Sequence, residues 1–264
     1  EEGRFLDGAE LSPDELLAHI AGGRKGYSHP PEVEDYERFF AEKLTEAQNV
    51  IHITMARHVS DGYQNACEAA KSFENVTVLD SGHLSSSMGL VVLCAAYMAE
   101  HHAAKEEILE AVKRMERFIS SAFIINNTHM MCQSGRIPKR IQILCDALLL
   151  HPVLALKRSR MVVSRMEIGS FSHAAKKYVK RTLQNTGNID RRILFITYSG
   201  MDEKRLRFIQ SLVQQYCPFE RVYLQKASSA IASNCGPGSF GLLFMRRDDA
   251  AVPFFQTAAH DGTV

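Results

Sequence analysis

A glycine-rich segment near the end of the chain combines side-chain and backbone groups that can hold an anion. Residues 233–241 read Ser-Asn-Cys-Gly-Pro-Gly-Ser-Phe-Gly. Glycine permits positive φ and close approach of the backbone to another group, and proline makes the turn rigid. The amides of Gly236 and Gly238, with the side chain of Asn234 beside them, suit an oxyanion or a carboxylate. A plain turn between two strands is the alternative, and the segment alone favours it.

Serine hydroxyls form a second group of candidate anion ligands. Ser87 precedes a long apolar segment, which predicts that it caps a helix whose macrodipole attracts an anion. Ser85 and Ser86 stand in the same loop and are alternative donors. Ser28 precedes His29-Pro30 in another loop, where turn formation alone also explains a serine.

Charge and composition exclude several classes of protein. The formal net charge is +1 and both signs are spread along the chain, so no nucleic-acid partner is predicted, and the basic run 136–140 is interpreted as a solvated turn. No stretch of about 18 apolar residues predicts a membrane span. The six cysteines lack CxxC pairs, which argues against a zinc site and a disulfide scaffold and indicates a reducing cytoplasm. No HxH or HExxH spacing supports a metal, and no cofactor is predicted.

The first part of the chain has the pattern of a parallel α/β sheet. Two short β-rich runs are each followed by a polar loop and a capped helix. Ligands of such sheets bind beyond the carboxyl ends of the strands, which adds Thr54 to the candidates. The strands are expected at 49–54 and 76–79, and the helices at 12–22, 33–47, 60–73, 88–102 and 104–118.

The second part predicts a mixed sheet with helices on one side. We place the boundary near residue 118, which gives an N-terminal α/β domain over 1–117 and a C-terminal α/β domain over 118–264. Arg158-Ser159 is expected to form the turn of a β-hairpin. Strands are expected at 121–126, 152–157, 160–166, 192–197 and 221–225, with helices ending near 150 and spanning 171–184 and 202–216.

Several segments in the same order resemble the DegV family of bacterial fatty-acid-binding proteins, which includes the acyl-carrying subunits of fatty acid kinase. The resemblance covers residues 4 to about 244. Tyr27-Ser28-His29-Pro30 is similar to the family's Thr-Ser-Gln-Pro loop, residues 53–66 to its SSxLSGTYQSA segment, Asp80-Ser81 with Ser87-Met88-Gly89 to DS…SxG, residues 134–137 with 151–154 to GGRI…kPIL, and residues 234–241 to HxGPGalG.

This resemblance implies a two-domain protein of the EDD fold, with a long-chain fatty acid in an apolar tunnel between the domains. It implies that the carboxylate lies near the inter-domain cleft, where a partner fatty acid kinase phosphorylates it. The protein itself would be a carrier and not an enzyme. The family's first strand would precede Glu1, so a truncated member of the family is expected.

Three departures from the family pattern affect the expected site. Tyr27 stands at the family's threonine, Asn234 stands at its histidine, and residues 167–173 offer no arginine in register. Neutral donors are therefore expected to hold the carboxylate, namely Ser87, Ser28 and the backbone of residues 234–238.

Two other functions stay open on the sequence. A serine-dependent acyl hydrolase is compatible with the many serines and histidines and with an oxyanion hole in the glycine turn, although no G-x-S-x-G motif is present. A lipid-sensing regulatory module, in which the lipid sets the pose of the domains, is the third function.

Overall fold

The computed structural model describes residues 3–247 and divides them into two compact units. The first unit combines residues 3–29 with Ser121–Ala155 and Val162–Met245. The second unit combines Pro30–Ser120 with Leu156–Met161. The predicted boundary near residue 118 stays a prediction about domains, and residues 248–264 of the predicted second domain lie outside the described residues.

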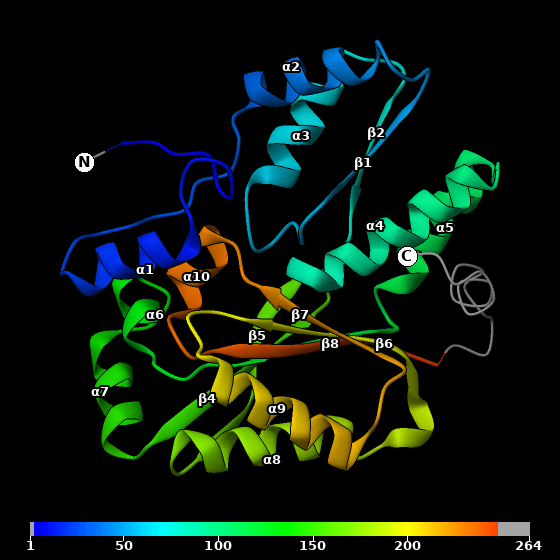
Figure 1. Cartoon of the computed structure of the whole chain (residues 1–264). Helices are drawn as coiled ribbons and strands as arrows, with labels where there is room; N and C mark the ends of the chain where they lie inside the picture. The colour runs from blue at the N-terminus through cyan, green and yellow to red at the C-terminus, as the bar shows by residue number, and fades with distance from the viewer. Residues whose placement is uncertain (1–2, 248–264) are drawn as a thin grey trace. The chain divides into compact units, whose positions relative to one another are not determined.

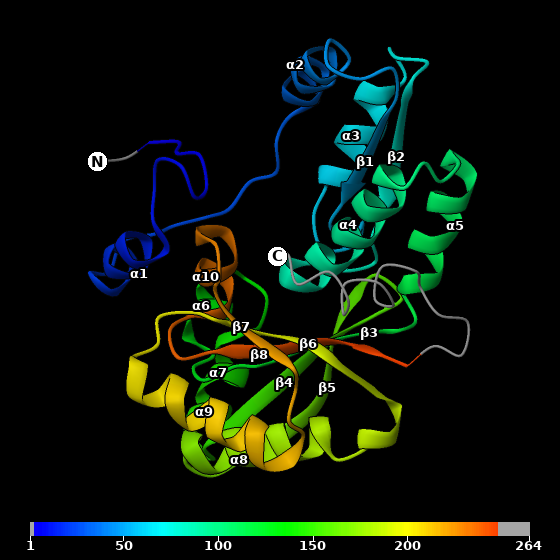
Figure 2. The ribbon, with the colours of Figure 1, turned by 45° about the vertical axis from the view of Figure 1, so that its right-hand side comes forward.

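The second unit is built on a small parallel sheet, as the sequence predicts. Strand β1 (Val50–Thr54) pairs with β2 (Val76–Asp80), and their last residues, Thr54 and Asp80, are register partners. Helices lie on both faces of this pair (Figures 1 and 2). The fully buried ring of Phe40 packs there with the small helical residues Ala66 and Ala69. The helices are α2 (Val33–Lys43) and α3 (Gly62–Ala70) on one face, and α4 (Ser85–Glu100) and α5 (Lys105–Met115) on the other.

The first unit contains a six-stranded sheet with the order β5-β4-β3-β8-β6-β7. The sheet is mixed, as predicted, because β3 and β4 are antiparallel whereas β6 and β7 are parallel. Arg158 and Ser159 form the turn between β4 and β5 with positive φ at both positions, the conformation of a two-residue hairpin turn. The strands are β3 (Ile119–Ile124), β4 (Leu150–Lys157), β5 (Arg160–Ile168), β6 (Ile189–Tyr198), β7 (Arg221–Lys226) and β8 (Phe240–Arg246).

Helices α8 (Phe171–Leu183) and α9 (Glu203–Tyr216) cover one face of this sheet (Figure 1). Their apolar sides form the main core together with the sheet. Tyr178 of α8 is fully buried, and its hydroxyl donates to the carbonyl oxygen of Ala122 at 2.7 Å. The same hydroxyl accepts from the backbone amide of Leu242 at 3.0 Å, so it bridges the neighbouring strands β3 and β8.

Four further helices of the first unit lie together at one end of the sheet (Figures 1 and 2). They are α1 (Pro13–Ala21), α6 (His129–Gln133), α7 (Lys139–Ala147) and α10 (Ser229–Cys235). The Asp7 carboxylate accepts from the amides of Ser229, at 2.8 Å, and Ala230, at 3.1 Å, which attaches the N-terminal segment to α10. The hydroxyl of Ser229 donates to the Leu11 carbonyl at 2.8 Å.

The first residues of the glycine-rich segment belong to a helix. Ser233, Asn234 and Cys235 form the last turn of α10, and only residues 236–239 form the connection to β8. The interpretation as a turn between two strands is therefore wrong. None of the helices in residues 3–247 is long and apolar enough to cross a membrane.

Candidate ligand-binding site

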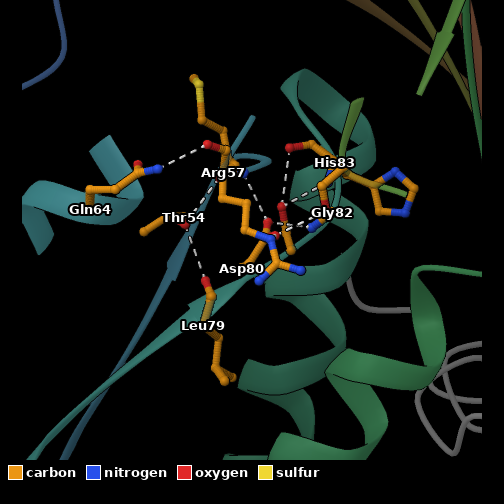
Figure 3. A network of polar contacts seen from close by, with 10 residues as sticks. Thr54, Arg57, Gln64, Leu79, Asp80, Gly82 and His83 are labelled. Atoms are coloured by element: carbon orange, nitrogen blue, oxygen red, sulfur yellow. Dashed lines mark hydrogen bonds and ion pairs between the residues drawn. The ribbon is translucent and has the colours of Figure 1, made fainter. Parts of the chain in front are cut away.

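Polar contacts connect the carboxyl ends of β1 and β2 in the second unit (Figure 3). The Asp80 carboxylate forms an ion pair with the guanidinium of Arg57 at 3.2 Å. It also accepts from the amide of Gly82 at 2.8 Å and the hydroxyl of Ser159 at 2.9 Å. These donors come from the loop after β1, the loop after β2 and the turn between β4 and β5, so the carboxylate connects three separate segments.

Thr54 is buried at the end of β1 and has protein partners for its hydroxyl. Its Oγ1 donates to the carbonyl oxygens of Met55 at 3.1 Å and Leu79 at 3.2 Å (Figure 3). A threonine hydroxyl has one proton, and these two carbonyl oxygens at the strand ends share it. The geometry gives Thr54 a structural contact, and its role as a ligand stays a prediction.

The serines at residues 85–87 form the first turn of α4. The helix begins at Ser85 with Leu84 as the N-cap residue, so the prediction that Ser87 caps the helix is wrong. Ser87 is fully buried, and its hydroxyl donates to the Leu84 carbonyl at 2.5 Å. Any of the three serines suits a cap, so their types did not fix where the helix starts. The positive end of the helix dipole still lies at this turn.

His83 lies in the loop before α4 and was not among the predicted ligands. Its side chain is 2 % exposed, and its ring nitrogens form no hydrogen bond of good geometry with the described residues, while the backbone of Glu116 lies close to the ring. Burial lowers the pKa of His83 to about 4. Figure 3 shows its ring directed away from the Asp80 contacts. A neutral, buried imidazole therefore lies in the second unit.

A polar pocket of about 300 Å³ lies in the first unit. It is formed by the loop after α1, the turn between α6 and α7, and the end of α10. Three predicted ligand residues, Tyr27, Ser28 and Asn234, are brought together here although they come from distant parts of the sequence. The complete lining is Gly26, Tyr27, Ser28, Ser134, Gly135, Arg136, Ser233 and Asn234.

Asn234 positions its neighbours in this pocket. Its Oδ1 accepts from Nε of Arg136 at 2.7 Å. Its Nδ2 donates to the Ala230 carbonyl at 2.7 Å and to Oγ of Ser28 at 3.4 Å. The amide group is therefore used within the protein, and it orients Arg136 and Ser28.

Arg136 is the charged residue of this pocket, and it was not among the predicted ligands. It lies in an exposed turn, where Gly135 has a φ of +74°, and it contributes the guanidinium of the pocket lining. The segment Ser134-Gly135-Arg136-Ile137 is part of the family resemblance, and that signal could have identified the arginine. Its position in a basic run favoured the interpretation as a solvated turn.

The glycine amides are not available to an anion. The amide of Gly236 donates to the Ala232 carbonyl at 2.9 Å, and that of Gly238 donates to the Ser199 carbonyl at 2.7 Å. These two amides are therefore not the free donors that the sequence predicts. Gly238 has a φ of +81°, and a Cβ there would lie 2.5 Å from Nδ2 of Asn126. The glycine permits this close packing.

Comparisons with known proteins agree with this architecture. The family model described as "Uncharacterised protein, DegV family" matches residues 1–247. A DegV domain-containing protein of Caldanaerobacter subterraneus is 23% identical over 243 residues, which cover 91% of this chain and 86% of the relative.

Two solved structures share the fold. One is described as fatty acid binding of a DegV family protein from Thermus thermophilus, with 25% identity, a TM-score of 0.81, and coverage of 92% of this chain and 87% of that chain. The other is the fatty acid kinase B3 protein of Streptococcus pneumoniae loaded with linoleic acid, with 16% identity, a TM-score of 0.77, and coverage of 92% and 86%. On the evidence of the matching model and the shared fold, this chain belongs to the DegV family.

Proposed function

We propose that this protein binds one long-chain fatty acid non-covalently and carries it without transforming it. The observation that carries this proposal is the TM-score of 0.81 with a DegV family protein described as binding fatty acid, at 25% identity. The match extends over 92% of this chain.

Helix α4 has the physical properties that an amphiphilic ligand requires. It spans 16 residues, about 24 Å, of which the first three are serines and most of the others are apolar. A helix that is apolar on all sides is normally buried, yet Val92 and Leu93 are 39% and 43% exposed. We assign the acyl chain to these side chains and the carboxylate to the positive end of the helix dipole.

Transfer of the bound fatty acid to a partner kinase is the further part of this proposal. Its support is the shared fold with a fatty acid kinase B protein that was loaded with linoleic acid. The serine-hydrolase alternative has less support, because the hydroxyl of Ser87 donates to the backbone carbonyl of Leu84.

The test is the uptake of palmitate or oleate by lipid-free protein, followed by native mass spectrometry. We expect one fatty acid per chain. Leu93→Glu is expected to weaken binding by about tenfold or more, because it places a charge against the acyl chain. Ile143→Glu, a matched change at a 57% exposed apolar position on α7, is expected to bind like the wild type.

Two outcomes would contradict the proposal. The first is wild-type protein that takes up neither fatty acid. The second is equal weakening by Leu93→Glu and Ile143→Glu, which would remove α4 from the binding site. If the purified chain hydrolyses an acyl ester, the hydrolase function would be favoured over the carrier function.

A further inference from the structure

The pocket around Arg136 has the charge of an anion site. Its lining contains one guanidinium, three serine hydroxyls and no carboxylate. The hydroxyls of Ser134 and Ser233 donate to the carbonyls of Met131 and Ala230, which leaves that of Ser28 for a ligand. We propose that this pocket binds a phosphate group, either free or as the monoester of a small molecule. The pocket lies wholly within the first unit, so the proposal goes beyond the assignment of the acyl chain to α4.

The side-chain donors are already oriented. Nε of Arg136 donates to Oδ1 of Asn234, and the two terminal nitrogens have no protein acceptor among the described residues. One edge of a guanidinium can donate two parallel hydrogen bonds to a pair of phosphate oxygens. The oxygen of Ser28 accepts from Asn234, which leaves the hydroxyl proton of Ser28 for a ligand.

The arrangement of the donors favours phosphate over carboxylate. Arg136 belongs to the turn before α7, whereas Ser28 and the backbone of Gly26 and Tyr27 belong to the loop after α1. Donors that approach from two segments can reach three or four oxygens of a tetrahedral group. A carboxylate has two oxygens in one plane, which the guanidinium alone would satisfy. A volume of about 300 Å³ also leaves room for the group attached to a phosphate.

The experiment is a calorimetric titration at low ionic strength with inorganic phosphate, phenyl phosphate and acetate. Arg136→Gln is the test variant, and we expect it to weaken phosphate binding by about tenfold or more. Arg140→Gln removes the same charge from an exposed position outside the pocket lining and is expected to change binding by less than about twofold. Melting temperatures of both variants check that they are folded.

The outcomes separate the possible ligands. Binding of inorganic phosphate alone indicates free phosphate, and tighter binding of phenyl phosphate indicates a monoester; each supports the site. If acetate binds as tightly as phosphate, the phosphate-site proposal is overturned in favour of a carboxylate site. Unchanged binding in Arg136→Gln, or equal losses in both variants, would also overturn it. Palmitate uptake by Arg136→Gln tests the fatty-acid proposal separately.

Discussion

Replacing Tyr178 by phenylalanine is expected to lower the free energy of unfolding by about 3 kcal/mol. The hydroxyl bridges the Ala122 carbonyl of β3 and the Leu242 amide of β8 from a fully buried position. Without it, two buried backbone groups lose a hydrogen-bond partner. Each unsatisfied group costs about 1–3 kcal/mol.

Urea denaturation, followed by circular dichroism, measures this effect. Tyr216→Phe is the matched control, because Tyr216 packs against the same core while only partly buried. We expect the control to change the unfolding free energy by less than about 0.5 kcal/mol. Equal effects of the two substitutions would show that the bridge between β3 and β8 contributes little.

Acid is expected to destabilise the protein through His83. The pKa of this side chain is about 4 in the folded protein because of its burial, below the ordinary value of 6.5. The unfolded chain therefore takes up a proton first as the pH falls, and stability that is complete above pH 6.5 is lost toward pH 4. At about 1.4 kcal/mol for each pKa unit, the loss amounts to about 3 kcal/mol.

Unfolding free energies at pH 7, 6, 5 and 4 test this expectation. His83→Phe fills a similar volume without a titrating group and should remove about 3 kcal/mol of the acid-induced loss. His52, whose pKa is also lowered by burial, contributes in the same direction and remains in this variant. His58→Phe, at an exposed position, should keep the wild-type loss. If His83→Phe loses as much unfolding free energy between pH 7 and pH 4 as the wild type does, other groups cause the acid destabilisation.

Local sequence patterns predicted most elements of the fold. The alternation of strand, polar loop and helix identified β1, β2 and the helices that follow them, and Arg158-Ser159 correctly marked the hairpin turn. Such patterns depend on contacts between residues that are close in sequence. Helices α6 and α10 were missed, because they are short and have little apolar periodicity.

The site was predicted less completely, because it depends on contacts between distant segments. Ser28 and Asn234 were predicted as ligands, and the structure brings them together. Only the structure shows that the side-chain amide of Asn234 is hydrogen-bonded to Arg136, Ser28 and Ala230. The Gly238 amide was expected to be free, and its acceptor Ser199 lies on another segment. Sequence can suggest which groups are polar, but not which of them are already paired.

The attachment of the N-terminal segment to α10 has a consequence for synthesis on the ribosome. Asp7 and Ser229 are separated by 222 residues, which take roughly 10 to 40 seconds to translate at about 5–20 residues per second. Leu16 and Ile20 of α1 pack against Met130, which is translated about midway through that interval, and α1 also contacts α10, which is translated only at its end. The nascent chain thus carries an early helix whose packing is completed only when α10 is translated, which makes it a substrate for chaperones that hold unfolded segments.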